Sequence, residues 1–123
     1  SMADALFIEY PKCSTCRRAK AWLDAHGISY VDRHIVEQPP TAAELAEWQP
    51  RSGLPVRRFF NTSGMVYREQ GIKARLDAGM MDAEAFGLLA ANGMLVKRPL
   101  LVGSDFVLVG FKEPEWQEAL LGA

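Results

Sequence analysis

The spacing of hydrophobic residues predicts a strand, a helix and a second strand in the first 36 residues. An apolar run at 5–10 is typical of a buried strand. In 14–26, apolar side chains recur three and four residues apart, and Gly27 favours the end of a helix. Residues 28–36 are rich in β-branched and aromatic side chains, which favours a strand. The intervening helix is long enough for a crossover, so we expect the two strands to be parallel.

The middle of the chain, 39–93, has mainly helical patterns. A capping box at 41–44 begins one helix, and Pro50 is expected to end it. Two short helices are expected within 55–71, and Asp82 is a candidate cap for a further helix. This region therefore predicts a helical block of about 60 residues between flanking strands.

The pattern changes again after Pro99. Two short β-branched and aliphatic runs, 100–102 and 106–109, flank a turn at 103–105 and predict a β-hairpin. Pro114 favours the start of a final helix. The predicted order is β-α-β, a helical block and β-β-α, which is an α/β fold in one domain.

Composition limits the classes of function. The 123 residues are 49% hydrophobic and 24% charged, as expected of one globular domain. The formal net charge of -1 gives no support for direct nucleic-acid or membrane-surface binding. No apolar run approaches the roughly 18 residues of a membrane span, and the first residues lack the features of a signal peptide. A cytoplasmic protein is therefore expected.

The chemistry of the chain centres on its two cysteines, Cys13 and Cys16. They lie where the first strand gives way to the first helix, and a helix N-terminus favours a thiolate. Lys12, Arg17 and Arg18 add nearby positive charge. The spacing puts both cysteines on one face of the helix. We predict that Cys13 is a nucleophile and Cys16 a resolving thiol.

Two other interpretations of the cysteines are weaker. A structural zinc site needs four ligands as a rule, and the only histidines that could join the cysteines are His26 and His34. Inert buried cysteines rarely begin a helix beside three cations. Redox chemistry is therefore the preferred hypothesis, with no metal bound.

Three short motifs resemble those of a known family. They are EYPKCSTCRRA at 9–19, KRPLL at 97–101 and VGF at 109–111. In this order they resemble the ArsC/Spx family, which contains glutaredoxin-linked arsenate reductases, Spx redox-sensing transcription regulators and many uncharacterised reductase-like proteins. The chain is most similar to the uncharacterised reductase-like branch.

The resemblance implies a thioredoxin-like fold, βαβ…ββα, with an inserted helical subdomain. One domain would cover 1–123, with its thioredoxin-like core at about 4–38 and 94–123 and the insertion at about 39–93. This order agrees with the elements predicted from the hydrophobic pattern.

The resemblance also assigns roles to particular residues. Cys13 matches the family's nucleophile, and Cys16 matches the resolving cysteine of the Spx-type pair. Arg98 matches the family's Arg-Pro arginine, with a cis bond before the proline; its planar donor fork suits an oxyanion or a thiolate. Five neighbours are candidate substrate-binding residues: Lys12, Ser14, Thr15, Arg17 and Pro99.

Two arginines of the family's arsenate site have no match. Asn61 stands at the position of the middle arginine, and Gly110 stands near that of the last. Arg57 and Lys112 are cations at other positions. One guanidinium holds a dianionic oxyanion only loosely, so arsenate is not the expected substrate.

The resemblance implies a bacterial, cytoplasmic thiol–disulfide oxidoreductase related to arsenate reductases. It implies no bound cofactor, a small thiol or redox protein as partner, and glutathione, glutaredoxin or thioredoxin as electron donor. The second hypothesis is a Spx-like regulator that binds RNA polymerase and uses the Cys13–Cys16 disulfide as its switch. A metal-binding module is the third and weakest.

Overall fold

The computed structural model of the protein describes residues 4–122. Within them, the backbone forms two compact units: one runs up to His34 and resumes at Arg98, and the other is Ile35–Lys97. The expected domain limits, 1 and 123, lie outside the described residues. Residues 1–3, part of the segment in which no signal peptide was expected, lie outside them as well. No helix within 4–122 is long and apolar enough to cross a membrane.

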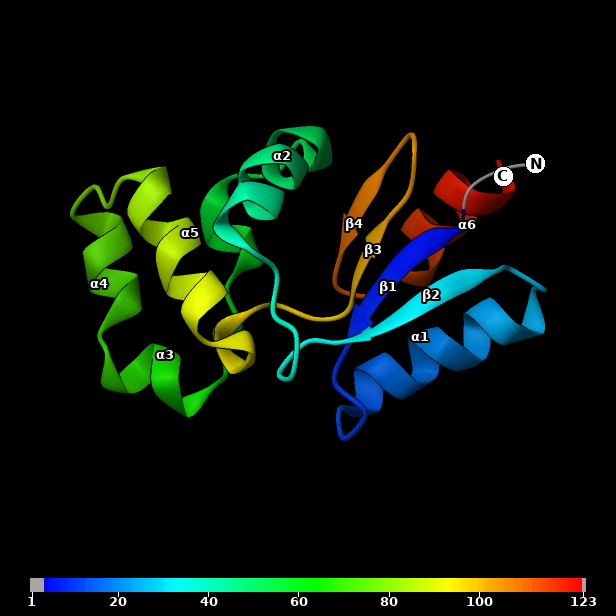
Figure 1. Ribbon diagram of the computed structural model, residues 1–123, viewed down its shortest axis with the longest axis horizontal. Coiled ribbons are helices and arrows are strands. Elements are labelled where there is room, and N and C mark those ends of the chain that lie inside the picture. The colour runs from blue at the N-terminus through cyan, green and yellow to red at the C-terminus, as the bar shows by residue number, and fades with distance from the viewer. Residues whose placement is uncertain (1–3, 123) are drawn as a thin grey trace. The chain divides into compact units, whose positions relative to one another are not determined.

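The first unit has a four-stranded mixed sheet in the order β2-β1-β3-β4 (Figure 1). β1 is parallel to β2, as predicted, and β3 is antiparallel to both β1 and β4. The elements are β1 (Ala5–Glu9), α1 (Ser14–Ala25), β2 (Tyr30–His34), β3 (Leu100–Val102), β4 (Val107–Val109) and α6 (Glu113–Leu121). This is the predicted α/β, thioredoxin-like order, βαβ…ββα.

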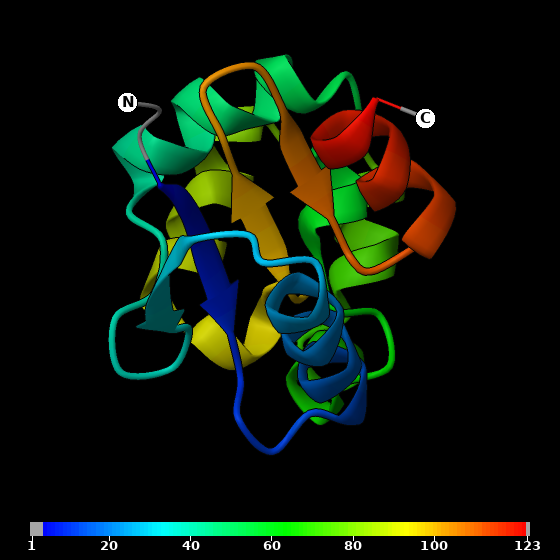
Figure 2. The ribbon, with the colours of Figure 1, turned by 90° about the vertical axis from the view of Figure 1, so that its right-hand side faces the viewer.

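The core of the first unit lies between the sheet and two helices, α1 and α6, which both stand in front of the strands in Figure 2. Phe7 of β1 and Leu101 of β3 contact Leu23 of α1 and Trp116 of α6, and all four are fully buried. Each such side chain contributes about 1.5–3 kcal/mol when removed from water. Packing of α1 on the sheet therefore fixes the N-terminus of α1 at the end of β1.

The second unit is helical. Its elements are α2 (Ala42–Ser52), η1 (Val56–Phe59), α3 (Met65–Glu69), α4 (Ile72–Asp77), α5 (Asp82–Ala91) and η2 (Gly93–Leu95). The predicted capping box is present: Glu44 N–H donates to Thr41 Oγ1 at 3.0 Å, and Thr41 N–H donates to Glu44 Oε1 at 2.9 Å. The hydrophobic pattern did not separate α4 from its neighbours.

Two predicted helix boundaries were wrong. Pro50 does not end α2, which continues to Ser52 and ends at Gly53 in a left-handed conformation. Pro50 lies in the last turn, where its carbonyl accepts from Gly53 N–H at 3.2 Å. Asp82 does not cap α5; it is the first helical residue, and Met81 is the N-cap. A carboxylate in the first turn still interacts favourably with the helix dipole.

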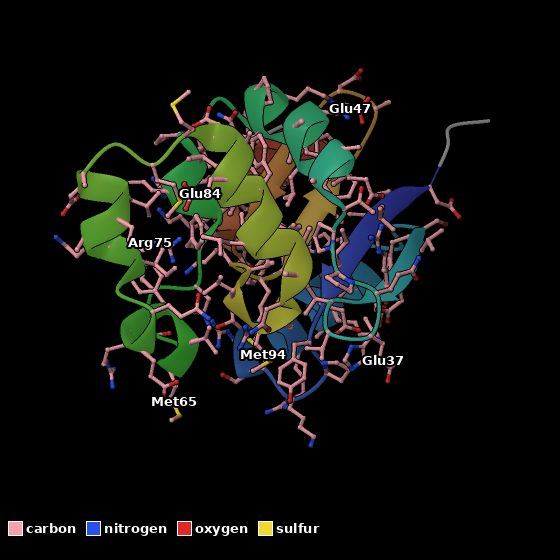
Figure 3. All side chains as sticks on the ribbon, turned by 60° about the vertical axis from the view of Figure 1, so that its left-hand side comes forward. Glu37, Glu47, Met65, Arg75, Glu84 and Met94 are labelled. Carbon is pink, nitrogen blue, oxygen red and sulfur yellow. The ribbon has the colours of Figure 1, made fainter. Side chains whose placement is uncertain are left out.

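An exposed ion pair joins two helices of the second unit. Arg75 of α4 donates to Glu84 of α5 at 2.8 Å, and both side chains are labelled in Figure 3. Ion pairs at such exposure contribute about 0–1 kcal/mol. The positive charges of this block are thus partly paired on its surface and stabilise it little.

Candidate active site

Cys13 occupies the N-cap of α1, immediately after the turn that follows β1. Cys13 has an extended backbone, and its N–H donates to the carbonyl of Tyr10 at 2.9 Å. The first turn of α1 contains no acidic side chain. The helix dipole at this position therefore favours a thiolate without competition from a neighbouring carboxylate on the helix.

The surroundings of Cys13 stabilise its thiolate. Partial burial alone would raise the pKa of this thiol. The backbone N–H groups of Cys16 and Thr15, the Cys16 thiol and the Arg98 guanidinium outweigh that effect and lower the pKa below that of an ordinary cysteine. Cys13 is half-buried, so the sulfur remains accessible to a reactant.

Arg98 precedes strand β3, which pairs with β1 and so brings Arg98 close to Cys13. The register pairs Ile8 of β1 with Leu100 of β3, so Arg98 lies level with the turn after β1. Its guanidinium lies over the ring of Tyr10, with 5.3 Å between Cζ and the ring centroid. This cation–π contact orients the guanidinium beside the thiol. The Arg98–Pro99 peptide bond is cis.

Cys16 has the opposite properties. It is fully buried, one turn into α1. Burial raises the pKa of its thiol, the neighbouring Cys13 and Glu9 add to this increase, and a favourable interaction with the backbone N–H of Tyr10 opposes it; the resulting pKa is about 12. Both cysteines are free thiols in this structure. The environment of Cys13 thus favours the nucleophilic thiolate, and that of Cys16 favours the protonated thiol.

The candidate substrate-binding residues differ in their positions. The Arg17 guanidinium donates to the Pro11 carbonyl at 3.1 Å and so holds the turn rather than the sulfur. Thr15 contributes its backbone N–H to the Cys13 thiolate. Lys12 and Ser14 are exposed at the rim of the turn. Pro99 is buried, and its carbonyl accepts from the Gly110 N–H at 2.8 Å.

Sequence reasoning missed a cluster of charged residues beside Cys16. Glu9 ends β1 and is only 4% exposed. Lys20 of α1 lies 2.7 Å from Asp32 of β2 and 3.8 Å from Glu9. With Arg17 and other neighbours, these residues line a pocket of about 500 Å³. The available signal was Glu9 itself, a carboxylate inside an otherwise apolar strand pattern.

The two carboxyl groups of this cluster have pKa values shifted in opposite directions. Burial raises the pKa of Glu9 most, the hydrogen bond to Asp32 and the charge of Asp32 add to this increase, and Lys20 opposes it; the resulting pKa is about 7. The pKa of Asp32 is lowered, because hydrogen bonds with Glu9 and Lys20 outweigh its burial. The proton shared by the two carboxyls therefore resides on Glu9.

The positions of the unmatched arginines have local explanations. The Asn61 side chain donates to the Met94 carbonyl at 3.4 Å and accepts from Ser63 Oγ at 3.1 Å. Gly110 has φ +76°, a left-handed conformation that an arginine adopts only with strain. Of the other two cations, Arg57 donates to Asp77 at 2.7 Å.

His26, one of the two histidines considered as zinc ligands, contacts Trp22. His26 Nδ1 lies 2.8 Å from the Trp22 carbonyl, and its ring lies 4.1 Å from that of Trp22. Among residues 4–122, no group of three or more His, Cys, Asp or Glu side chains is arranged to hold a metal ion.

Comparison with known proteins identifies the family. The model of the ArsC family matches residues 8–119, which include the turn, both cysteines and Arg98. The chain belongs to the ArsC family. This family membership confirms the predicted resemblance.

Relatives within and near the ArsC family differ in what is known of them. The chain is 50% identical to the uncharacterized protein YusI of Bacillus subtilis over 91% of this chain and 94% of YusI. It is 29% identical to the global transcriptional regulator Spx of Listeria innocua, over 85% of this chain and 78% of Spx. A crystal structure described as ArsC family related, from Bacteroides fragilis, has a TM-score of 0.91 and 52% identity, covering 96% of this chain and 98% of that one.

Proposed function

We propose that this ArsC-family chain is a thiol–disulfide oxidoreductase with Cys13 as nucleophile and Cys16 as resolving thiol. The observation that carries the proposal is the contrast between the two thiols. Cys13 is half-buried with a lowered pKa, whereas Cys16 is fully buried with a raised pKa. A nucleophile needs the first set of properties. The resolving thiol is needed only after the nucleophile has reacted.

The proposed reaction is the reduction of a disulfide or of a glutathione mixed disulfide. The Cys13 thiolate attacks one sulfur of the substrate, forms a mixed disulfide and expels the other sulfur as a thiolate. Cys16 then attacks Cys13, closes the Cys13–Cys16 disulfide and releases the second thiol. The substrate gains two electrons and the protein loses two. Glutathione, glutaredoxin or thioredoxin would return them in the cytoplasm, where such thiol systems keep cysteines reduced.

The role of Arg98 follows from its position. Its guanidinium faces the Cys13 sulfur and lies over Tyr10, so it would stabilise the thiolate both before attack and when Cys13 is the leaving group. The proposed contacts for the substrate are Lys12, Ser14, Thr15, Arg17 and Pro99, with Lys12 and Ser14 exposed at the rim of the turn.

The pH dependence of Cys13 alkylation tests this function. In a Cys16→Ser variant, the iodoacetamide reaction rate should follow the Cys13 thiolate and show a midpoint below the roughly 8.5 of a free cysteine. Replacing Arg98 by Met in that background should move the midpoint to higher pH, because a positive partner is lost.

The matched control is Arg18→Met, which removes a nearby cation that is not among the groups stabilising the thiolate. It should leave the midpoint in place. A midpoint at or above the free-thiol value in the Cys16→Ser protein would rule out Cys13 as an activated nucleophile.

A second candidate function is redox-sensing transcription regulation. The identity to the regulator Spx over 85% of this chain favours it, and the same cysteine pair would be the switch. The partner would be RNA polymerase, bound by the helical unit. A pull-down with the oxidised and reduced full chain distinguishes the two functions, because a regulator should recover polymerase subunits in one redox state.

A further inference from the structure

Cys16 presents a chemical problem that the proposed function leaves open. To resolve a mixed disulfide on Cys13, the Cys16 thiol must lose its proton, yet it is fully buried and its pKa is raised to about 12. Solvent hydroxide reaches such a site slowly. A resolving step of useful rate therefore needs a base inside the protein, close to the Cys16 sulfur.

Three features of the backbone bring Glu9 to this sulfur. Ala5 and Phe7 face α1, and strand side chains alternate, so Glu9 faces α1 as well. Cys16 and Lys20 are four residues apart on the side of α1 that faces Glu9. The backbone N–H of Tyr10, the next residue, interacts with the Cys16 sulfur. Glu9 therefore faces the same side of α1 as the Cys16 thiol and the ammonium of Lys20, and its charge acts on that thiol.

We propose that Glu9 is the general base that accepts the Cys16 proton during resolution of the Cys13 mixed disulfide. This inference rests on the proposed function and adds a residue to its mechanism. Glu9 is the one buried charged residue of the described chain, and its partners Lys20 and Asp32 offset the cost of that burial.

The proposed step balances as follows. A Glu9 carboxylate oxygen takes the proton of the Cys16 thiol, and the Cys16 sulfur attacks Cys13 Sγ. The Cys13–Cys16 bond forms as the bond from Cys13 to the substrate sulfur breaks. The substrate leaves as a thiolate with the electron pair of the broken bond. Glu9 ends the step neutral, and the two cysteines end it oxidised.

The charged cluster provides a way for the proton to leave. Glu9 hydrogen-bonds with Asp32, which binds the Lys20 ammonium, and all three line a pocket of about 500 Å³ open to solvent. The titratable and charged groups that face Glu9 are Lys20, Arg17 and Cys16 from α1 and Asp32 and His34 from β2. The pKa of Glu9, raised to about 7 by burial and by Asp32, lets it exchange protons near neutral pH.

Two-phase reaction with the aromatic disulfide DTNB separates attack from resolution. Attack by Cys13 releases one coloured thiolate in a second-order phase. Resolution by Cys16 releases the second in a first-order phase, and Cys16→Ser should abolish only that phase. In the wild type, the rate of the second phase should rise with pH through an inflection near 7, the Glu9 pKa.

The Glu9→Gln substitution keeps the shape of the side chain and removes the base. The second phase at pH 7 should slow by at least about tenfold, since general base catalysis typically contributes about 10²–10⁴-fold. Its inflection near pH 7 should disappear, while the first phase keeps its rate. An unchanged second phase with its inflection intact would overturn the proposal.

Asp32→Asn provides a second test if Glu9→Gln does not fold. Asp32 is on the exposed side of the cluster, and its charge raises the pKa of Glu9. Its removal should shift the inflection of the second phase to lower pH, and an unmoved inflection would contradict the role of Glu9. If the first phase itself is absent in the wild type, the proposed nucleophile fails rather than the proposed base.

Discussion

At the scale of single residues, the site has two thiols with opposite properties within one turn of helix. Cys13 lies at the N-cap, where backbone N–H groups and Arg98 face its sulfur, and its pKa is lowered. Cys16 points into the unit and is fully buried, and its pKa is raised to about 12. The two cysteines are only three residues apart, but they differ strongly in burial. Hydrogen bonds outweigh burial at the candidate nucleophile and lower its pKa, whereas burial dominates at the candidate resolving thiol and raises its pKa.

The raised pKa of Glu9 predicts how stability depends on pH. Below about pH 4.5, Glu9 is protonated in both the folded and the unfolded chain. Between about 4.5 and 7, the folded chain keeps a proton that the unfolded chain has lost, so the free energy of unfolding falls as pH rises. Above about 7 both states are charged, and the loss is complete.

Glu9→Gln should remove this loss. The difference in melting temperature between variant and wild type should be more favourable to the variant at pH 8 than at pH 5, as measured by circular dichroism. The comparison of two pH values cancels any packing change common to both. Equal differences at the two pH values would show that Glu9 has an ordinary pKa in the folded protein.

At the scale of elements, the boundaries of helices depend on close backbone approaches that the hydrophobic pattern does not show. Gly93 begins η2, and a Cβ added there would lie 1.9 Å from the Ile35 carbonyl oxygen. Gly87 lies within α5, and a Cβ added there would meet nothing within 4 Å. The first glycine is required by its neighbours, and the second is not.

These two glycines predict opposite effects of the same substitution. Gly93→Ala should destabilise the protein by about 1–3 kcal/mol, because the backbone of the second unit has to move. Gly87→Ala should stabilise it by about 0.5–1 kcal/mol, the usual gain of Ala over Gly within a helix. Urea unfolding of both variants measures the difference. A Gly93→Ala protein as stable as the wild type would mean that η2 and Ile35 are not so closely packed.

At the scale of the whole molecule, the chain combines a thiol site with an incomplete set of arginines for an oxyanion. Arg98 faces Cys13, whereas Asn61 is hydrogen-bonded to the Met94 carbonyl and Gly110 has a left-handed backbone. The chain belongs to the ArsC family, whose model matches residues 8–119, but membership of this family does not by itself identify the substrate. The chemistry of the residues favours a sulfur substrate over arsenate.

A substrate panel with the reduced full-length chain tests this selection. We expect turnover of glutathione mixed disulfides and of a protein disulfide, with little turnover of arsenate, in the presence of glutathione and glutaredoxin. The physical reason is that one guanidinium binds a dianion weakly. Cys13→Ser serves as the inactive control. Arsenate turnover at a rate comparable to that of the mixed disulfides would contradict the argument from the missing arginines.

The sequence predicted the parts of the fold that depend on local pattern. The strand and helix around Cys13, the parallel pair, the capping box at Thr41 and the hairpin followed from periodicity, turn residues and connection length. The predictions for Pro50 and Asp82 were wrong by one or two residues, because helix ends depend on which groups satisfy the last carbonyls and first N–H groups. Cys13 and Cys16 were predicted from their spacing at the start of a helix, and Arg98 from the motif resemblance; the roles of all three stay predictions.

By itself, the sequence determined that two cysteines lie at the junction of a strand and a helix, since spacing and periodicity are local properties. Only the tertiary structure decided which thiol is buried, that Arg98 lies beside Cys13, and that Glu9 shares a cluster with Lys20 and Asp32. These contacts join residues up to 85 positions apart, from Cys13 to Arg98. Electrostatic effects depend on distance in space and on burial, and strand register fixes both.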